Sequence, residues 1–379
     1  MKILLLGDAS NYHRALASGL SAEGHKVTLA SEGSRWMRTE RDIDISRRPG
    51  KAGGALLWLR LNTSLAPRLR GYDIVQICGP GFLSLKPVRI LKIFERLRRD
   101  NGRVFVTALG NDNAYIRSCL GPECPLAYSE WHTPEGPSPW SRSPEAETSI
   151  WLSDEMRRFT DAVYTGSQGL VTALYEHQAV FGAVYPQVPV SYAGIPIDTA
   201  SLAALAAEAR ERRRREAEAG APLRILYAAH RGRELEKGAD RILRAASEAV
   251  ARHPGKAVIS TPGNVPYSSF LRLLAEADIV LDQAYSYTPA TTALLAMALG
   301  AVPASGGEEE YYSFIGEDTL RPVINVDPFD DGKTADAIAR VIADRELFAR
   351  MSSQGPEFVK RHNDSIVVAQ RFAKAWEKA

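Results

Sequence analysis

The feature that most constrains the fold is a regular alternation of short apolar runs with stretches of helical periodicity. The runs at residues 2–7 (KILLLG), 103–110 (RVFVTALG) and 223–230 (LRILYAAH) are apolar for most of their length. Each predicts a strand that is covered on both faces, as the strands of a parallel sheet are. Amphipathic stretches such as residues 236–253 (EKGADRILRAASEAVARH) lie between such runs. Strands that alternate with helices along the whole chain predict an α/β protein with doubly wound parallel sheets.

The chain length and one change of composition divide this alternation in two. With 379 residues the chain is too long for one ordinary core. Residues 200–219 are mostly Ala, Arg and Glu, which predicts a charged helix. We therefore expect two Rossmann-like domains that face a cleft. The expected boundaries are residues 1–198 for the first domain, 199–221 for a charged helical linker, 222–360 for the second domain, and 361–379 for a C-terminal helix that crosses back to the first.

Two stretches of the first half need separate predictions. Residues 162–166 (AVYTG) are expected to form a short strand between two helices. Residues 121–147 are rich in Pro, Ser, Trp and Glu and are too long for a simple connection. This segment predicts a functional flap or a surface excursion.

The composition excludes several functional classes. A formal net charge of +2 gives no basis for nucleic-acid binding. Three cysteines are too few for a disulfide framework and do not form the two pairs of a zinc site, which favours thiols in a reducing cytoplasm. No apolar run approaches the roughly 20 residues of a membrane span, and the N-terminal MKILLLGDAS reads as a buried strand rather than a secretion signal. We expect a cytoplasmic protein without a metal site.

Four segments, in the right order, resemble motifs of the GT-B fold glycosyltransferases, most closely the large retaining family four. Residues 160–199 contain a strand that ends in the turn Ala-Gly-Ile-Pro-Ile-Asp, similar to the family's Asn-Gly-(Ile/Val)-Asp turn. Residues 225–243 (ILYAAHRGRELEKGADRIL) resemble its Gly-Arg … Glu-Lys-Gly loop. Residues 294–310 (LLAMALGAVPASGGEEE) resemble its Glu-Ala-Met-Ala-Cys-Gly-x-Pro-Val segment followed by Gly-Gly. The opening strand and residues 72–80 (YDIVQICGP) fit its acceptor domain more loosely.

The resemblance implies a site for a nucleotide-diphosphate sugar on the second domain. The diphosphate is dianionic, and cationic side chains together with a helix N-terminus would neutralise it. The expected cations are Lys237 and either Arg231 or Arg233. Thr291 and Thr292 begin the next helix, where they could donate to the distal phosphate or simply cap the helix.

The sequence departs from the family at the two Glu residues of its donor motif. The alignment places Tyr287 and Leu295 at these positions. Leu295 cannot accept a hydrogen bond, so ribose binding must differ, whereas Tyr287 could stack on a sugar or donate one hydrogen bond. The missing carboxylate could come from Asp282 or from the acidic residues 308–310, of which Glu308 is the predicted donor-binding residue. The other interpretation of this triplet is a charged surface turn.

The loop after the first strand supplies candidates for both substrates. Gly7 permits close approach of the backbone to the donor phosphates. Asp8, Asn11 and Tyr12 are the predicted acceptor-binding residues. His13 is a candidate for proton transfer, or else a hydrogen-bonded polar residue at a helix start.

Asn111 and Asp112 occupy the place where the family often has a His near the sugar being transferred. An amide and a carboxylate at the carboxyl end of a strand could hold sugar hydroxyls or take a proton, or could only form a turn. Trp131, His132 and Trp140 in the irregular segment could stack on sugars or pack the segment itself.

The resemblance therefore implies a hexosyltransferase-type glycosyltransferase. It would move a sugar from a nucleotide-diphosphate donor to a glycan, lipid-linked or small-molecule acceptor, with retention of configuration and without a metal or other cofactor. The expected partners are the nucleotide sugar and the acceptor; basic residues 89–103 suggest peripheral contact with the inner membrane or, more simply, a solvated helix face. The missing carboxylates leave two alternatives, namely a non-catalytic partner of a transferase complex and a sugar-nucleotide 2-epimerase.

Overall fold

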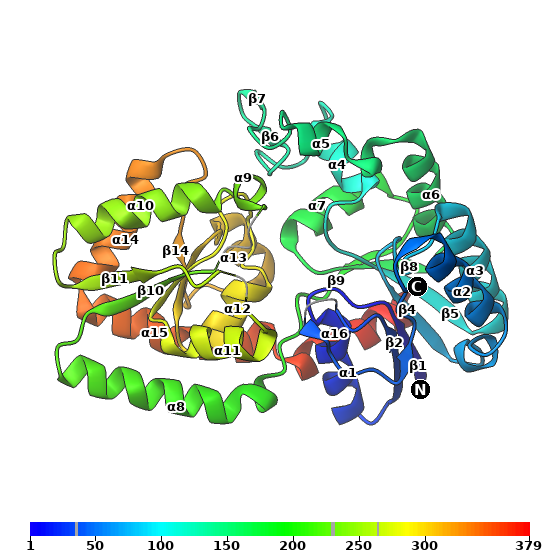
Figure 1. Ribbon diagram of the computed structural model, residues 1–379, viewed down its shortest axis with the longest axis horizontal. Coiled ribbons are helices and arrows are strands. Elements are labelled where there is room, and N and C mark those ends of the chain that lie inside the picture. Colours follow the sequence, from blue (N-terminus) through cyan, green and yellow to red (C-terminus); the bar gives the residue numbers. More distant parts are fainter. Residues whose placement is uncertain (35–36, 229–231, 264) are drawn as a thin grey trace. The chain divides into compact units, whose positions relative to one another are not determined.

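The computed structural model describes residues 1–34, 37–228, 232–263 and 265–379, and it divides into two compact units (Figure 1). The first unit comprises Met1–Ala127, Ser143–Pro196 and Ser365–Ala379. The second unit comprises Tyr128–Arg142 and Ile197–Asp364. Each unit is built on a parallel sheet, which confirms the predicted α/β class with two doubly wound domains.

The first unit contains a seven-stranded sheet with the order β3-β2-β1-β4-β5-β8-β9. All neighbouring strands are parallel; Leu4 of β1, for example, lies opposite Thr28 of β2 and Val75 of β4. After β1, the chain adds β2 and β3 on one side of it and then adds β4, β5, β8 and β9 on the other side. The switch point of the sheet therefore lies between β1 and β4. The strands are β1 (Lys2–Leu6), β2 (Lys26–Ser31), β3 (Ile43–Asp44), β4 (Ile74–Cys78), β5 (Arg103–Ala108), β8 (Gly169–Thr172) and β9 (Val190–Tyr192).

Helices cover this sheet, and the last helix of the chain is among them. Helix α16 packs so closely on α1 that a Cβ at Gly19 would lie 1.9 Å from the carbonyl oxygen of Ser365. The indole of Trp376 is buried and donates to Gln76 of β4 at 2.9 Å. The helices of the unit are α1 (Tyr12–Ala22), α2 (Gly50–Asn62), η2 (Ala66–Leu69), α3 (Pro87–Asp100), α4 (Asn113–Leu120), α5 (Pro144–Glu147), η3 (Ile150–Leu152), α6 (Asp154–Thr165), α7 (Tyr175–Val184) and α16 (Ser365–Lys378).

The strand predicted at residues 162–166 is wrong. Helix α6 continues to Thr165, and the strand follows it as β8. The helix begins at the capping side chain of Ser153, and Met156, Phe159 and Val163 recur at helical spacing on its buried face. This stripe outweighs the β-branched and aromatic residues in AVYTG, which by themselves favour a strand.

The second unit contains a five-stranded parallel sheet with the order β11-β10-β12-β13-β14. Its strands are β10 (Leu223–Tyr227), β11 (Ala257–Ser260), β12 (Ile279–Leu281), β13 (Val302–Ser305) and β14 (Ile324–Asn325). Figure 1 shows α10 and α14 on one side of the sheet and α8, α11 and α12 on the other. The helices are α8 (Thr199–Glu218), α9 (Glu234–Lys237), α10 (Ala239–Ala251), α11 (Tyr267–Glu276), α12 (Thr291–Ala298), α13 (Glu309–Ile315), α14 (Asp331–Ala343) and α15 (Arg345–His362).

The irregular segment between residues 121 and 147 is shared between the two units. Its middle part, Tyr128–Arg142, belongs to the second unit and carries the antiparallel pair β6 (His132–Thr133) and β7 (Gly136–Pro137). The predicted first domain, residues 1–198, included these residues. Within the described residues, no helix has both the length and the hydrophobicity that crossing a membrane requires.

Candidate functional site

The candidate site of the second unit lies at the carboxyl edge of its sheet. The strand order reverses between β10 and β12, and ligands of open α/β sheets bind where such a reversal opens the loops. The loop after β10 leads into α9, and the loop after β12 leads into α12. Both predicted donor-binding segments therefore begin at this switch point.

Lys237, at the end of α9, and Gly238 contact the loop that follows β12. The carbonyl oxygen of Lys237 accepts a hydrogen bond from Ala284 N at 2.8 Å, which ties α9 to the loop after β12. Gly238 has φ +64°, and a Cβ there would lie 2.9 Å from the ring of Tyr285. Glycine is required because both the dihedral angle and the space exclude a side chain. The Lys237 ammonium lies 3.9 Å from the buried Asp282 carboxylate, which leaves donors available on its three N–H bonds.

The sequence predicts that either Arg231 or Arg233 binds the diphosphate. Arg231 lies outside the described residues. Arg233 forms a two-pronged ion pair with Glu236, with both N–O distances at 2.7 Å. The guanidinium of Arg233 would have to leave Glu236, or bind with its remaining N–H groups, to reach a phosphate.

The N-cap residue of α12 makes no side-chain hydrogen bond. The N-cap is Ala290, which has no side chain that could cap the helix, and the first turn contains no acidic residue. Thr291 and Thr292 are half-buried in that first turn, and neither of them is the N-cap. The first backbone N–H groups of a helix need acceptors, and here no side-chain cap provides one. The site thus offers a helix N-terminus and an ammonium, which is a suitable pair for an anion.

Tyr287 lies under a second aromatic ring. Tyr128 stacks on it with ring centroids 4.5 Å apart and an angle of 16° between the rings. The hydroxyl of Tyr128 donates to the Glu308 carboxylate at 2.8 Å, and Tyr128 N donates to the Tyr287 hydroxyl at 3.2 Å. Burial raises the pKa of Glu308, and the hydrogen bond from Tyr128 opposes that rise. Tyr287 and Glu308, which are predicted donor-binding residues, are thus brought together by a residue that the sequence did not indicate.

The other candidate carboxylates are placed differently. Asp282 is buried at the end of β12 beside Lys237. Glu309 pairs with Arg321 at 2.9 Å on the surface, and Glu310 is exposed. Leu295 is buried within α12, so the position of the absent family carboxylate is part of the core.

In the first unit, the loop after β1 brings Gly7, Asp8 and His13 together. Gly7 has φ +81° and accepts a hydrogen bond from His13 Nδ1 at 2.7 Å. Asp8 accepts from His13 N at 2.9 Å, and burial raises the pKa of Asp8 although this hydrogen bond opposes the rise. His13 is fully buried, and its Nε2 has no hydrogen-bond partner among the residues that the structure describes. Burial lowers the pKa of His13 to about 4, so the imidazole is neutral at neutral pH and its Nε2 is an acceptor.

The two remaining acceptor candidates have structural partners. Asn11 adopts the left-handed conformation with φ 65°, and its backbone N–H donates to Ser34 at 3.0 Å. Tyr12 is buried, and its hydroxyl donates to the carbonyl oxygen of Gly194 at 2.8 Å. Acceptor binding by Tyr12 would therefore use its ring or compete with that hydrogen bond.

Asp112 is the buried N-cap of α4. One carboxylate oxygen accepts from Tyr115 N at 3.1 Å, and the other accepts from the Tyr164 hydroxyl. Burial raises the pKa of Asp112 to about 6, against the hydrogen bonds that stabilise its charged form. Asn111 precedes it at the end of the loop and is only half-buried. The turn interpretation of this Asn-Asp pair thus accounts for Asp112, and a catalytic role for either residue stays a prediction.

The aromatic residues of the irregular segment pack on one another. Trp131 and Trp140 meet edge to face with centroids 6.1 Å apart, and Trp131 is buried. His132 Nδ1 lies 3.0 Å from the Ser129 hydroxyl. These contacts favour the packing interpretation of the segment over sugar stacking by its tryptophans.

The chain also contains an Asp-Ile-Asp triplet at residues 42–44, which was not among the predicted site residues although this pattern can bind metal. The Asp42 carboxylate accepts from Leu29 N at 2.7 Å, and Asp44 pairs with Arg41 at 3.1 Å. These contacts give the triplet a structural role, because Asp42 joins β2 to the residues that begin β3. For Tyr128, by contrast, the one feature of the sequence that could have indicated a role in the site was its position in the long irregular segment.

Comparison with known proteins identifies the fold. No family model matches the chain, and no curated protein matches it. Sucrose-phosphate synthase from Thermosynechococcus elongatus is similar over 100% of this chain and 99% of that chain, with 14% identity and a TM-score of 0.65. HepE from Anabaena, solved in complex with UDP and glucose, matches over 100% of both chains with 12% identity and a TM-score of 0.59. The fold is GT-B. A putative UDP-N-acetylglucosamine 2-epimerase from Listeria monocytogenes shares it, with 12% identity, a TM-score of 0.52, and coverage of 98% of this chain and 94% of that one.

Proposed function

We propose that this protein is a glycosyltransferase that uses a nucleotide-diphosphate sugar. The observation that carries the proposal is that Lys237 follows β10 and the start of α12, which has no side-chain cap, follows β12, and these two strands flank the switch point of the second sheet. A diphosphate is bound by cations and by the backbone N–H groups of a helix N-terminus, and this edge carries an ammonium and the start of a helix. The HepE structures with UDP and with UDP-glucose support the same class of ligand, because they share the fold.

The donor would lie on the second unit. Lys237 and the first N–H groups of α12, with Thr291 and Thr292, would hold the diphosphate. Tyr287, Tyr128 and Glu308 would face the nucleoside or the sugar, and Glu308 would replace the absent family carboxylate as hydrogen-bond acceptor. Neither a metal nor another cofactor is part of this proposal, because cationic side chains and the helix neutralise the leaving group.

The first unit would bind the acceptor with the loop after β1. In the transfer, the acceptor oxygen bonds to the anomeric carbon while the bond from that carbon to the diphosphate oxygen breaks. The acceptor proton passes to the departing diphosphate or to a base. Of the three catalytic candidates, His13 has an acceptor nitrogen with no partner in the described part of the chain, whereas Asp112 already accepts two hydrogen bonds and Asn111 could only position a hydroxyl.

The resemblance to retaining family four supports the finer features of the proposal. They are a hexose as the transferred group, retention of configuration, and a glycan or lipid-linked acceptor at the cytoplasmic face of a membrane, as in polysaccharide biosynthesis. The same fold in a putative 2-epimerase keeps that reaction as the second candidate.

The test is thermal stabilisation by a panel of UDP-, GDP-, ADP- and dTDP-sugars. A donor at 100 times its Kd should stabilise the protein by about 2.7 kcal/mol, a rise in Tm of roughly 5–10 °C. Lys237→Ala should lose the shift, whereas Lys360→Ala, which removes an exposed lysine of α15 in the same unit, should keep it. If no nucleotide sugar stabilises the wild type, the donor site does not exist and the non-catalytic partner is the better interpretation.

A second measurement separates the two enzymatic candidates. The nucleotide product is followed with the identified donor, with and without a glycan or lipid-linked acceptor. A transferase releases nucleotide in proportion to acceptor glycosylated. Conversion of the sugar nucleotide to its 2-epimer without any acceptor would refute transfer and support the epimerase.

A further inference from the structure

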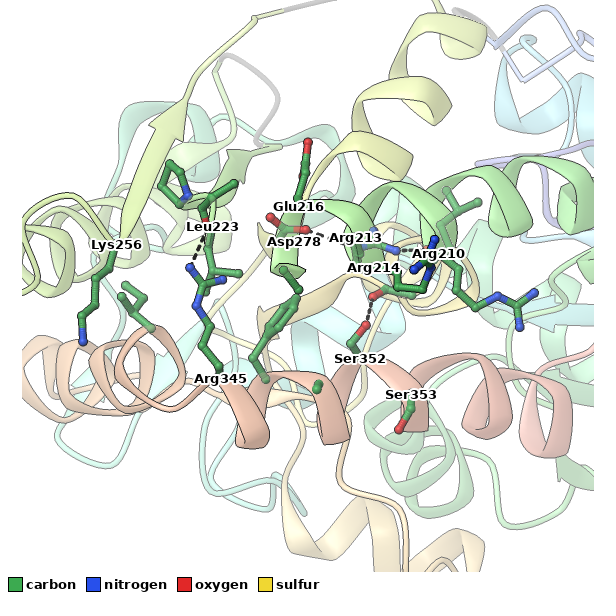
Figure 2. Close-up of a pocket in the computed structure, with 18 of the residues that line it drawn as sticks. Arg210, Arg213, Arg214, Glu216, Leu223, Lys256, Asp278, Arg345, Ser352 and Ser353 are labelled. Atoms are coloured by element: carbon green, nitrogen blue, oxygen red, sulfur yellow. Dashed lines mark hydrogen bonds and ion pairs between the residues drawn. The ribbon is translucent and has the colours of Figure 1, made fainter. Parts of the chain in front are cut away.

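A second pocket lies at the opposite, amino-terminal edge of the same sheet. It has a volume of about 740 Å³, which is within the range of small-molecule sites. Its walls come from the residues that precede β10, β11, β12 and β13, from α8, and from the junction of α14 with α15 (Figure 2). The whole pocket belongs to the second unit, and none of its lining residues is part of the proposed donor site.

The body of the pocket is apolar. Its lining includes Leu223, Leu299, Ile342 and Phe348, which belong to the buried interior of the unit, together with several alanines of α8, α12 and α15. An apolar group that enters such a space leaves water and contacts these side chains, which favours binding. The pocket therefore suits a ligand with a hydrocarbon part.

The buried charges at the inner wall pair with one another and with carbonyl groups. Arg213 donates to the carbonyl oxygens of Leu299 and Ala277, both at 2.6 Å, and lies 3.3 Å from the Asp278 carboxylate. It thereby serves the carbonyl groups that the ends of α11 and α12 leave without helical partners. Arg212 also pairs with Asp278, at 2.8 Å. These groups are structural, and they leave little need for a ligand charge at this wall.

The rim of the pocket, in contrast, has cations in excess. The whole lining contains five basic side chains and two carboxylates; of the five, Arg213 belongs to the inner wall and Arg214 pairs with Glu211 and Glu218, which leaves Arg210, Lys256 and Arg345 at the rim. The two carboxylates, Glu216 and Asp278, are held by Arg212, and Arg224 holds Glu216 as well. Arg210 and Lys256 are exposed, and within the described part of the chain neither makes an ion pair. Figure 2 shows the side chains of Arg210 and Lys256 extending away from the wall at different places around the pocket.

We propose that this pocket is a second ligand site that binds a single-chain anionic amphiphile. The hydrocarbon part occupies the apolar body, and the anionic head group pairs with rim cations such as Arg210, Lys256 and Arg345. Apolar walls and an unneutralised cationic rim match both parts of such a ligand, whereas a free inorganic anion would use only the rim. The inference does not depend on the proposed sugar transfer, because the pocket and the donor site use opposite edges of the sheet.

The experiment measures binding of monododecyl phosphate by calorimetry, below its critical micelle concentration, to the full-length protein. Inorganic phosphate and a neutral dodecyl ether of ethylene glycol are the two partial ligands. Dodecyl phosphate should bind with one-to-one stoichiometry and at least tenfold more tightly than either partial ligand. Equal binding of inorganic phosphate would show a simple anion site, and equal binding of the neutral ether would show an apolar site. Either result would overturn the proposal.

Two sets of variants locate the binding. The pair Arg210→Gln and Lys256→Gln removes two rim charges without touching the core, and binding should weaken by about five- to thirtyfold. Ala349→Trp, at an exposed lining position of α15, should block the pocket. The matched control is Lys92→Gln with Arg158→Gln, two exposed cations of the first unit. Equal losses in the control pair, or full binding to Ala349→Trp, would place the amphiphile elsewhere and refute the site.

Discussion

Gly238 allows the sharpest quantitative test of the proposed donor loop. Substitution by alanine forces an L-residue into φ +64°, which costs about 1–2 kcal/mol. The new Cβ would also lie 2.9 Å from Tyr285 Cε2 and 3.0 Å from Ala284 Cβ. Overpacking of this kind costs about 1–3 kcal/mol. We therefore expect Gly238→Ala to destabilise the second unit by about 2–5 kcal/mol, which corresponds to a fall in Tm of roughly 4–20 °C.

Differential scanning calorimetry with a matched glycine variant tests this reasoning. Gly255 has φ +76° and no atom within 4 Å of an added Cβ, so Gly255→Ala should show the conformational cost alone. Because Lys237 O is bonded to Ala284 N, displacement of Ala284 should also move Lys237 and weaken nucleotide-sugar binding in Gly238→Ala only. Equal Tm changes in the two variants would refute the steric argument.

Three further predictions concern packing and charge in the second unit. Burial raises the pKa of Glu317, but hydrogen bonds from His362 and the backbone lower it more, to below its ordinary value. The resulting stability is complete above the unfolded-state pKa of about 4.3 and is lost progressively as the pH falls from there toward the lower folded-state pKa. Glu317→Gln should therefore cost about 3–5 kcal/mol in urea titrations at pH 7 and about 2 kcal/mol less at pH 3; a cost independent of pH would contradict this. Tyr128→Phe removes the hydroxyl that donates to Glu308 and contacts the Ser286 carbonyl, and it should destabilise the unit by about 1–2 kcal/mol with faster amide exchange in its segment. Unchanged exchange would show that the hydroxyl does not anchor the segment. The lysine of Arg213→Lys cannot reach both helix-end carbonyls, so this substitution should lower the free energy of unfolding by about 2–3 kcal/mol. The control Arg214→Lys, at an exposed position, should lower it by less than about 0.5 kcal/mol. Similar losses in the two variants would contradict a structural role for Arg213.

The fold could be predicted from the sequence because its signals are local. A buried parallel strand is a short apolar run, and a surface helix shows its own periodicity, so the strand–helix alternation was sufficient for both sheets. The error at residues 162–166 arose where the two signals overlap. AVYTG has strand residues, yet Val163 and Tyr164 continue the buried face of a helix that starts ten residues earlier at Ser153.

The candidate site was only partly accessible from sequence, because its contacts are long-range. Lys237 and α12 follow directly after strands, so their edge of the sheet could be predicted. The stack of Tyr128 on Tyr287 joins residues that are far apart in the chain, and no local pattern indicates it. The same holds for Asp112, whose partner Tyr164 comes from another helix and whose capping role removes much of its freedom to act as a base.

The two edges of the second sheet should attract anions by different physics. At the carboxyl edge, the start of α12 presents backbone N–H groups, so the helix itself favours negative charge. At the amino edge, α11 and α12 present carbonyl groups, which would repel an anion. Arg213 offsets that repulsion by donating to those carbonyls, and its two terminal nitrogens are then engaged. Attraction at the amino edge must therefore come from the exposed rim cations, which salt screens strongly, whereas the donors of the carboxyl edge are fixed in the fold and are screened less.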